Sequence, residues 1–513
     1  MATRSTLEGV FPTKNKTSDS KPEFAGDYLL QYIILHGHSG EQIDIKNIVQ
    51  ELNVYESIYR HAVTGTVVIG DTQNQIARMK IQGLERIEFK LIRPGYKDSI
   101  DASVKTGEPF EVYKITNRKM VTPTLMVYTL HFASREFMRN IRTKVSQAYS
   151  GRYDLAVLDI LSDKDYLDSR KKLFYEPTAN QDKIVVPNVR PFDAIQTIAS
   201  KAMPNNSGGV GYYFYETTKG FNFRSWDSMV ARAGAFARRP KQQFYYQPLK
   251  LSNERETDKV QEGYQTIESF EFINNIHDVA ANVALGTYGH RVLTHNLYSK
   301  SFDKKDYHYH NEFNDSLHTD SFFKQEEFTG ADAGFATNTK KLDNFAVAET
   351  PVDYDNEDSI SDYPESRVSV QSTTQYLHGE ISGMYGIDVD NDGSKTGEYI
   401  SQRNQVQHGT AIKMTIKGQP GISAGDLVVI NLKDPNADRD KNPAEGLLND
   451  PRFSGNYVVT KVRHQVTGDI YKMVLECVKD SVSTYNGKGR SVRETSKVFT
   501  PQVIDSSDPY GSI

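Results

Sequence analysis

Short apolar runs, separated at close spacing by turns, restrict the first part of the chain to a β-structure. The runs are DYLLQYIILHG, TGTVVIGD, GLERIEFKLIRP, PFEVYKITNRK and LMVYTLHFAS, and Gly, Pro and polar residues stand between them. Such spacing is typical of a barrel or a sandwich. We therefore predict a first β-barrel over residues 27–140, preceded by a flexible polar arm over residues 1–26.

The hydrophobic period changes to that of helices after residue 134. Ser134 is a candidate N-cap, and Pro191 suits a first helical position, although Arg190 before it is a poor cap. The apolar residues at helical spacing fall in three segments: Phe137, Met138, Ile141 and Val145; Leu155, Leu158 and Leu161; Phe192, Ile195, Ile198, Ala199 and Ala202. Residues 211–228 then read as a hairpin that turns at Gly220. We predict a mixed α/β domain over residues 141–235.

The strand pattern returns in two separate pieces. YQTIESFEFINN and DVAANVALGTYGHRVLTHNLY belong to the first piece, and RVSVQSTTQY, HGTAIKMTIKG, GDLVVINL and SGNYVVTKVRHQVTGDIYKMVLECVKD to the second. Residues 303–365 between them hold 16 Asp or Glu against 5 Lys, with little periodicity, which predicts an acidic insertion or loop. We predict a second β-barrel from residues 236–302 and 366–481, followed by a polar tail over residues 482–513.

Composition and charge exclude several classes of protein. With 61 basic and 66 acidic residues the net charge is −5, which does not fit a nucleic-acid-binding protein. No run approaches the roughly 18 apolar residues of a membrane helix, and the N-terminus lacks the apolar core of a signal peptide. One cysteine excludes an internal disulfide framework and a multi-cysteine zinc site, and it indicates folding in a reducing compartment. A chain of 58.0 kDa should form two to four domains.

One stretch has part of a calcium-loop pattern. In IDVDNDGSKTGEY, the residues Asp388, Asp390 and Asp392 have the right spacing. The twelfth loop position should be a bidentate glutamate, but Tyr399 occupies it, Glu398 falls one residue short, and no good helix is predicted beside the loop. We interpret the stretch as a solvated acidic turn, and whether the three aspartates bind a cation stays open.

The remaining candidates for chemistry favour structural roles. HGH at 36–38 and HYH at 308–310 each lack an obvious third metal ligand. GGVGYY at 208–213 precedes a strand and reads as a turn rather than a phosphate-binding loop. Cys477 alternates with apolar residues and is interpreted as a core residue, and His464 as structural. The sequence thus predicts no catalytic, cofactor-binding or metal-binding residue, no cofactor and no enzyme activity.

The C-terminal parts follow a recognisable order. Gly421–Asp426 has the form Gly-x-x-x-Gly-Asp, and a strand, a polar loop, a Gly-x-Tyr strand with His464 near its end, a turn and a last strand follow. This order resembles the end of the second barrel in hub and spike-base proteins of contractile injection machines. ELNVYESIYRHAVTGTVVIGD resembles their first barrel, and RPFDAIQTIASKA with the GYYFYETTKGFNF hairpin resembles their inserted α/β domain.

Over about residues 27–297 and 366–480, the chain resembles the central baseplate hub proteins of T-even-like contractile-tailed bacteriophages, and more distantly the base of type VI secretion spike proteins. The resemblance implies a mainly β fold with an α+β insertion: two tail-tube-like β-barrel domains joined through a mixed α/β domain, in a ring-forming chain. It does not extend to the acidic stretch, the aspartate-rich loop or the polar ends.

The resemblance also implies a role and partners. Hub proteins are non-enzymatic homotrimers of the virion tail baseplate, assembled in the host bacterial cytoplasm. Three subunits present six barrels, which adapts a trimeric cell-puncturing spike to a sixfold tail tube. The implied partners are the spike, tube or tube-initiator proteins, the tape-measure protein and, as a further option, baseplate wedge proteins. DNA would pass through the axial channel without specific binding, and no stable membrane association is implied.

Two other interpretations stay open at this point. One is another structural baseplate or spike-adaptor protein, which would share the composition but not the order barrel, α/β, barrel. The other is a β-rich glycan hydrolase carried on a phage tail, which would use two carboxylates across a cleft. The sequence nominates no such pair.

Overall fold

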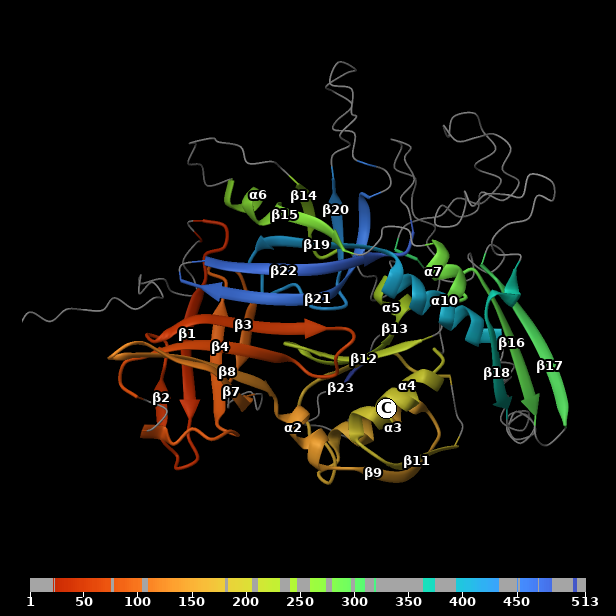
Figure 1. The fold of residues 1–513 in the computed structure, drawn as a ribbon, viewed down its shortest axis with the longest axis horizontal. Helices are drawn as coiled ribbons and strands as arrows, with labels where there is room; N and C mark the ends of the chain where they lie inside the picture. Colours follow the sequence, from red (N-terminus) through yellow and green to blue (C-terminus); the bar gives the residue numbers. More distant parts are fainter. Residues whose placement is uncertain are drawn as a thin grey trace, which may run out of the picture.

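The computed structural model of the chain is mainly β (Figure 1). It describes residues 22, 24–74, 78–103, 109–179, 183–204, 211–230, 240–246, 259–273, 279–296, 300–309, 318–319, 363–373, 394–432, 450, 453–468, 470–481 and 502–504.

The first eight strands form an antiparallel array, here called the N-terminal sheet, shown in red and orange in Figure 1. They are β1 (Leu29–His36), β2 (Gln42–Asp44), β3 (Val49–Ser57), β4 (Thr64–Asp71), β5 (Arg86–Ile92), β6 (Ser99–Ala102), β7 (Phe110–Thr122) and β8 (Leu125–Ser134). The order is β2-β1-β5-β7-β8-β4-β3, with β6 beside β5. A backbone hydrogen bond from Ile45 N to Ile33 O (2.9 Å) links β1 to the segment before β3. The two ends of the strand order therefore approach each other, and the sheet curls around its buried face.

Six later strands close into a small β-barrel, here called the C-terminal barrel. They are β14 (Gln243–Tyr246), β15 (Thr266–Ile273), β19 (Thr410–Lys417), β20 (Leu427–Asn431), β21 (Gly455–Thr467) and β22 (Ile470–Lys479). The pairing runs β21-β20-β14-β15-β19-β22 and returns from β22 to β21, so the ring has no open edge. A short helix, α6 (Lys259–Gln265), precedes β15. The alternation in β22 buries every second residue, Tyr471 to Cys477, as its sequence predicts.

Strand β21 belongs to both β-systems. Its first residues, from Gly455 to Val458, pair with β20, and its later residues, from Lys461 to Thr467, pair antiparallel with β3. The N-terminal sheet and the C-terminal barrel are therefore parts of one 14-stranded sheet, and one hydrophobic core extends through both.

A mixed α/β part lies beside the N-terminal sheet and has its own core (Figure 1). Its elements are α2 (Arg135–Arg142), β9 (Val145–Ser150), α3 (Tyr153–Ser162), β10 (Leu173–Tyr175), β11 (Lys183–Val189), α4 (Pro191–Lys201), β12 (Tyr212–Thr217), β13 (Gly220–Ser225) and α5 (Trp226–Val230). Strands β9 and β11 pair, and β12, β13 and β10 form a sheet with β23 (Gln502–Ile504) from the tail. The predicted hairpin is confirmed, and Gly220 at its turn has φ +134°, which favours glycine.

Three more strands form a separate small sheet, in green at the right of Figure 1. They are β16 (Gly289–Asn296), β17 (Ser301–His308) and β18 (Val368–Thr373), in the order β17-β16-β18, with the short helix η5 (Pro364–Ser366) before β18. Helix α10 (Ser394–His408) packs on β16 and β17 and contacts α7 (Val279–Ala284).

This small sheet corrects two sequence predictions. The acidic insertion was predicted to begin at residue 303, but residues 301–308 form β17, which pairs antiparallel with β16 and buries Tyr307. RVSVQSTTQY was predicted to be a barrel strand, but β18 pairs with β16 instead. Most of the remaining acidic stretch, and most of the N-terminal arm and the tail, lie outside the described residues. The predicted domain boundaries themselves stay predictions.

The helices are partly as predicted. Helix α4 begins at Pro191 and buries its predicted apolar face. Helix α2 ends at Arg142, however, so Val145 lies in β9, and Ile141 is 50% exposed because α2 buries Glu136 and Asn140 instead. DVAANVA was read as strand and forms α7. None of the helices in the described part of the chain combines the length and the apolarity that crossing a bilayer demands.

Candidate functional site

A fully buried carboxylate, that of Glu56 on β3, lies between the two β-systems. Its Oε1 accepts a hydrogen bond from the backbone N–H of Thr218 (2.8 Å), in the turn of the β12–β13 hairpin. Its Oε2 accepts one from the backbone N–H of Ala424 (2.9 Å), in the turn before β20. One side chain thus joins the N-terminal sheet, the α/β part and the C-terminal barrel. We call this contact the three-way joint.

Two barrel residues complete the three-way joint. His464 Nδ1 lies 2.7 Å from the Tyr471 hydroxyl, and His464 Nε2 lies 4.0 Å from Glu56 Oε1. Burial raises the pKa of Glu56, although the Thr218 and Ala424 donors act against it. Burial, with a smaller effect from Lys219, lowers the pKa of His464 to about 3, so the ring is neutral. These contacts hold the N-terminal sheet, the α/β part and the C-terminal barrel in fixed positions relative to each other.

The Gly-x-x-x-Gly-Asp turn has a defined place at this joint. Gly425 has φ +82°, and its N–H donates to Val459 O on β21 (2.7 Å). A Cβ at Gly425 would lie 2.0 Å from the Tyr215 hydroxyl oxygen of β12. Asp426 closes the turn by accepting the N–H of Ser423 (3.0 Å). The turn needs glycine because of both its backbone angle and this close approach.

A second buried carboxylate, Glu216 on β12, links the α/β part to the N-terminal sheet. Its Oε2 accepts the backbone N–H of Val63 (2.8 Å), and its Oε1 contacts the ammonium of Lys171 (2.5 Å). His61 stacks on Phe214 of the same strand, at 5.6 Å between ring centroids. The α/β part is therefore held to the N-terminal sheet by the buried carboxylate of Glu216 and by the stacking of His61 on Phe214.

A third buried carboxylate, Asp480, lies just after β22. Its Oδ1 accepts from the N–H and hydroxyl of Thr319 (2.9 and 2.7 Å), and its Oδ2 contacts His318 Nδ1 (2.9 Å) and Trp226 Nε1 (3.3 Å). Burial raises the pKa of Asp480, but His318 and the Thr319 donors outweigh it and hold the pKa at about 2. Asp480 thereby binds α5 and residues 318–319 to the end of the barrel.

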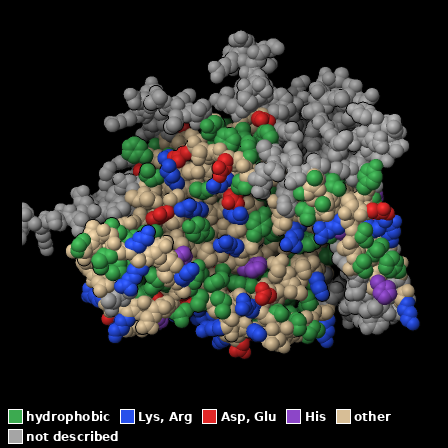
Figure 2. Space-filling model, in the orientation of Figure 1, with side chains coloured by type: hydrophobic (Ala, Val, Ile, Leu, Met, Phe, Trp, Pro, Cys, Tyr) green, Lys and Arg blue, Asp and Glu red, His purple; other side chains and the backbone are tan. Residues whose placement is uncertain are grey.

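The outer wall of the barrel carries ion pairs across neighbouring strands. Glu268 on β15 contacts Lys417 (2.6 Å) and Lys472 (2.8 Å), and Lys413 contacts Glu271 (2.5 Å). Figure 2 shows acidic and basic side chains side by side over the upper part of this face, and mostly basic ones below. Because these pairs are exposed, they contribute little to stability individually.

The sequence-nominated residues are not brought together. Asp388, Asp390 and Asp392 lie outside the described residues. His36 Nε2 contacts Glu88 (2.9 Å), and His38 Nε2 contacts Gly83 O (2.7 Å). The described part of the chain contains no group of three or more His, Cys, Asp or Glu side chains arranged to hold a metal ion.

The prediction for Cys477 is confirmed, because its side chain is fully buried in β22. Sequence reasoning missed the buried charges of Glu56, Glu136, Lys171, Glu216 and Asp480. Charged residues are rarely buried, so these residues were read as surface residues. A signal was available for two of them: Glu56 alternates in phase with Leu52 and Val54, and Glu216 with Tyr212 and Phe214, which places both on the apolar face of their strands.

Comparisons place the chain beside solved tail structures. No family model and no curated protein matches the sequence. A tail protein from Neisseria meningitidis is similar with a TM-score of 0.45 at 9% identity, over 88% of this chain and 97% of that one. The 43 kDa tail protein of prophage MuSo2 from Shewanella oneidensis gives 0.44 at 8%, over 88% and 98%. The c3393 protein of Escherichia coli, a type VI secretion component, gives 0.38 at 7%, over 90% and 80%. The chain is thus similar, at the level of the fold, to phage tail proteins and to a type VI secretion component.

Proposed function

We propose that this chain is the central hub of a contractile-tail baseplate, a non-enzymatic virion protein. As a homotrimer it would adapt a trimeric spike to the sixfold tail tube and leave an axial channel for the tape-measure protein and DNA. The proposal includes two tail-tube-like barrels per chain, one of them the curled N-terminal sheet.

The observation that carries the proposal is the junction between β3 and β21. A chain that contributes two equivalent barrels to a ring must hold the two barrels at a constant angle to each other. Here backbone hydrogen bonds cross directly from one β-system to the other, over residues 51–57 and 461–467. The backbone hydrogen bonds between β3 and β21 favour one rigid unit of two barrels. Three such units could supply the six barrels of a ring.

The three-way joint supports the same role. Glu56 links the α/β part to both β-systems through two backbone N–H groups. One side chain therefore fixes the positions of all three parts. A load-transmitting adaptor needs such fixed angles. A hydrolase would instead need an open cleft with carboxylates free to react, whereas both oxygens of Glu56 accept backbone N–H groups.

The first test is the mass of the purified chain in solution, measured by light scattering, alone and with spike and tube partners co-expressed. The hub predicts a threefold ring near three times 58.0 kDa, about 174 kDa, with a central hole in averaged particle images. A chain that stays monomeric with both partners would contradict the hub. Release of sugars from host glycans by such a monomer would favour the glycan hydrolase.

A further inference from the structure

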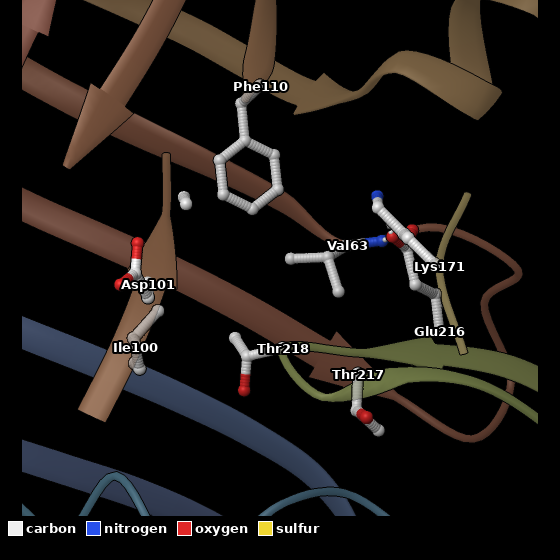
Figure 3. A pocket seen from close by; sticks show the side chains of 9 residues that line it. Val63, Ile100, Asp101, Phe110, Lys171, Glu216, Thr217 and Thr218 are labelled. Atoms are coloured by element: carbon white, nitrogen blue, oxygen red, sulfur yellow. Dashed lines mark hydrogen bonds and ion pairs between the residues drawn. The ribbon is translucent and has the colours of Figure 1, made fainter. Parts of the chain in front are cut away.

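A lysine is enclosed by two carboxylates in the interior of the α/β part. Lys171 Nζ lies 2.5 Å from Glu216 Oε1 and 2.9 Å from Glu136 Oε2. The three side chains are 6%, 2% and 4% exposed, respectively. They come from the segment before β10, from β12 and from α2, so the cluster connects three separate pieces of chain. Figure 3 shows Lys171 and Glu216 together at one side of a pocket.

Each carboxylate is also held from its other side. Glu216 Oε2 accepts the backbone N–H of Val63 (2.8 Å), and Glu136 Oε1 accepts the hydroxyl of Ser169 (2.7 Å). Apolar side chains lie close by, since the Phe221 ring centroid is 5.9 Å from Lys171 Nζ, and Val63 and Phe110 line the same pocket. The amine and the two carboxyl groups are therefore fixed in position before any reaction.

The charges in this cluster do not balance. One ammonium faces two carboxylates, which leaves a net negative charge in a buried site. Burial raises the pKa of Glu216 despite the contact with Lys171. Burial also acts to raise the pKa of Glu136, but the Lys171 ammonium and the Ser169 hydroxyl bring it below its usual range. The two carboxylates are therefore different: Glu136 is the stable anion, and Glu216 is the group that more readily accepts a proton.

We propose that Lys171 and Glu216 become joined by an intramolecular isopeptide bond, with Glu136 as the general acid–base catalyst. The fixed amine, the hydrogen-bonded acceptor carboxyl and the second carboxylate within reach of the reacting nitrogen carry this inference.

The reaction is a condensation that needs no oxidant, reductant or activating co-reactant. The Lys171 ammonium, which is the resting form, first passes a proton to Oε1 of Glu216, 2.5 Å away, which gives a free amine and a carboxylic acid. The amine attacks Cδ of Glu216, the C–N bond forms, and Glu136 takes a second proton from the nitrogen. The N–H of Val63 stabilises the negative charge that develops on Oε2 of Glu216. Glu136 then returns its proton to Oε1, the C–Oε1 bond breaks, and Oε1 leaves as water. One ammonium and one carboxylate thus become one amide and one water molecule.

The structure offers a place for the released water. A cavity of about 10 Å³ lies beside the cluster and is lined by Lys171, Glu216, Thr217 and Thr218, among others, which is room for about one water molecule. The condensation turns one ammonium and one carboxylate into a neutral amide, so the net charge of the cluster stays at one negative charge, carried by Glu136. The new amide N–H can then donate to Glu136.

The decisive measurement is the mass of the purified full-length protein, fresh and after overnight incubation at physiological temperature. The crosslinked chain is lighter than its sequence by one water molecule. Trypsin should fail to cleave after Lys171, because its amine is acylated, and the peptides that contain Lys171 and Glu216 should appear as one branched species. Tandem mass spectrometry then locates the bond.

Three variants separate the roles of the residues. Lys171→Arg keeps the positive charge but should have its full sequence mass, because a guanidinium does not condense. Glu136→Gln should lose the crosslink or form it at least tenfold more slowly, as expected for loss of an acid–base group. Glu216→Gln should still form it by losing ammonia, and its product should have the same mass as the crosslinked wild-type chain.

Two results would overturn the proposal. The first is a folded wild-type protein, verified by circular dichroism, that keeps its full sequence mass after incubation, which would make the cluster a buried ion triad. The second is a bond to Glu136 instead of Glu216. Neither result depends on whether the chain is a baseplate hub, since the mass is read on the isolated protein.

Discussion

The N-terminal sheet and the C-terminal barrel are built differently, although one core passes through both. The N-terminal sheet comes from one continuous stretch, from Leu29 to Ser134, and its strand order ends at β2 and β3. The C-terminal barrel collects strands from between Gln243 and Lys479, and its pairing closes on itself. The comparison shows that the open edge of the N-terminal sheet, at β3, is paired with β21, the longest strand of the C-terminal barrel. The N-terminal sheet therefore depends on the barrel for the pairing of its last strand.

Substitutions in the shared core, in either the N-terminal sheet or the C-terminal barrel, should cause the largest loss of stability. Phe89→Ala in β5 and Leu475→Ala in β22 each empty a fully buried position and should cost about 2–5 kcal/mol of unfolding free energy. Because the core is continuous, both should shift the same transition, followed by the fluorescence of the only tryptophan, Trp226. Two separate transitions, with only one of them moved by Phe89→Ala, would show that the systems unfold independently.

The three-way joint gives the next largest effect. Glu56→Ala leaves the N–H groups of Thr218 and Ala424 buried without their acceptor, at about 1–3 kcal/mol for each. Glu56→Gln keeps one acceptor oxygen and should lose roughly half as much in urea unfolding. An equal loss for both variants would mean that the charge, rather than the two hydrogen bonds, holds the joint.

Asp480 should make the barrel end sensitive to acid. A folded pKa of about 2, against an ordinary value of 3.8, means a contribution of about 2 kcal/mol that is complete above pH 3.8 and is lost as the pH falls through 2. Asp480→Asn should therefore be less stable at neutral pH by this amount, and its stability should fall less between pH 4 and pH 2. Urea titrations at several pH values measure both; parallel acid profiles for the two proteins would contradict the assignment.

The smallest effect is expected on the outer wall of the barrel. Lys413→Ala removes the ion pair with Glu271, whose partners are 45% and 63% exposed, and should lower the stability only slightly. The loss should shrink further in high salt because exposed charges are screened. A loss of unfolding free energy as large as that of Glu56→Ala would show that surface ion pairs stabilise the barrel as much as the buried joint does.

The sequence predicts best where one face of an element is apolar. The alternation in β21 and β22 and the face of α4 were readable, because burial of apolar side chains alone determines them. Helix α10 was not readable, because its buried side is polar. Ser401 Oγ donates to Thr287 O (2.6 Å), and Asn404 Nδ2 donates to Leu285 O (3.0 Å). No hydrophobic period marks such a helix.

The candidate site was unreadable for a related reason. Glu56 and Glu216 lie in phase with the buried apolar residues of their strands, but a carboxylate at such a position does not show which donors satisfy it. Whether a carboxylate is buried depends on contacts between residues far apart in the sequence, such as Glu56 with Ala424. The resemblance to hub proteins located these segments but gave no role to the two carboxylates.

The double pairing of β21 has a consequence for synthesis of the chain. Strand β3 leaves the ribosome long before β21, so the nascent N-terminal sheet must wait with one edge of β3 unpaired, while β4 covers the other. An unpaired edge invites aggregation with other chains, and a chaperone that covers it would raise the yield. A chain truncated before Gly455 can neither close the barrel nor cover this edge of β3, so it should aggregate rather than accumulate as a folded fragment.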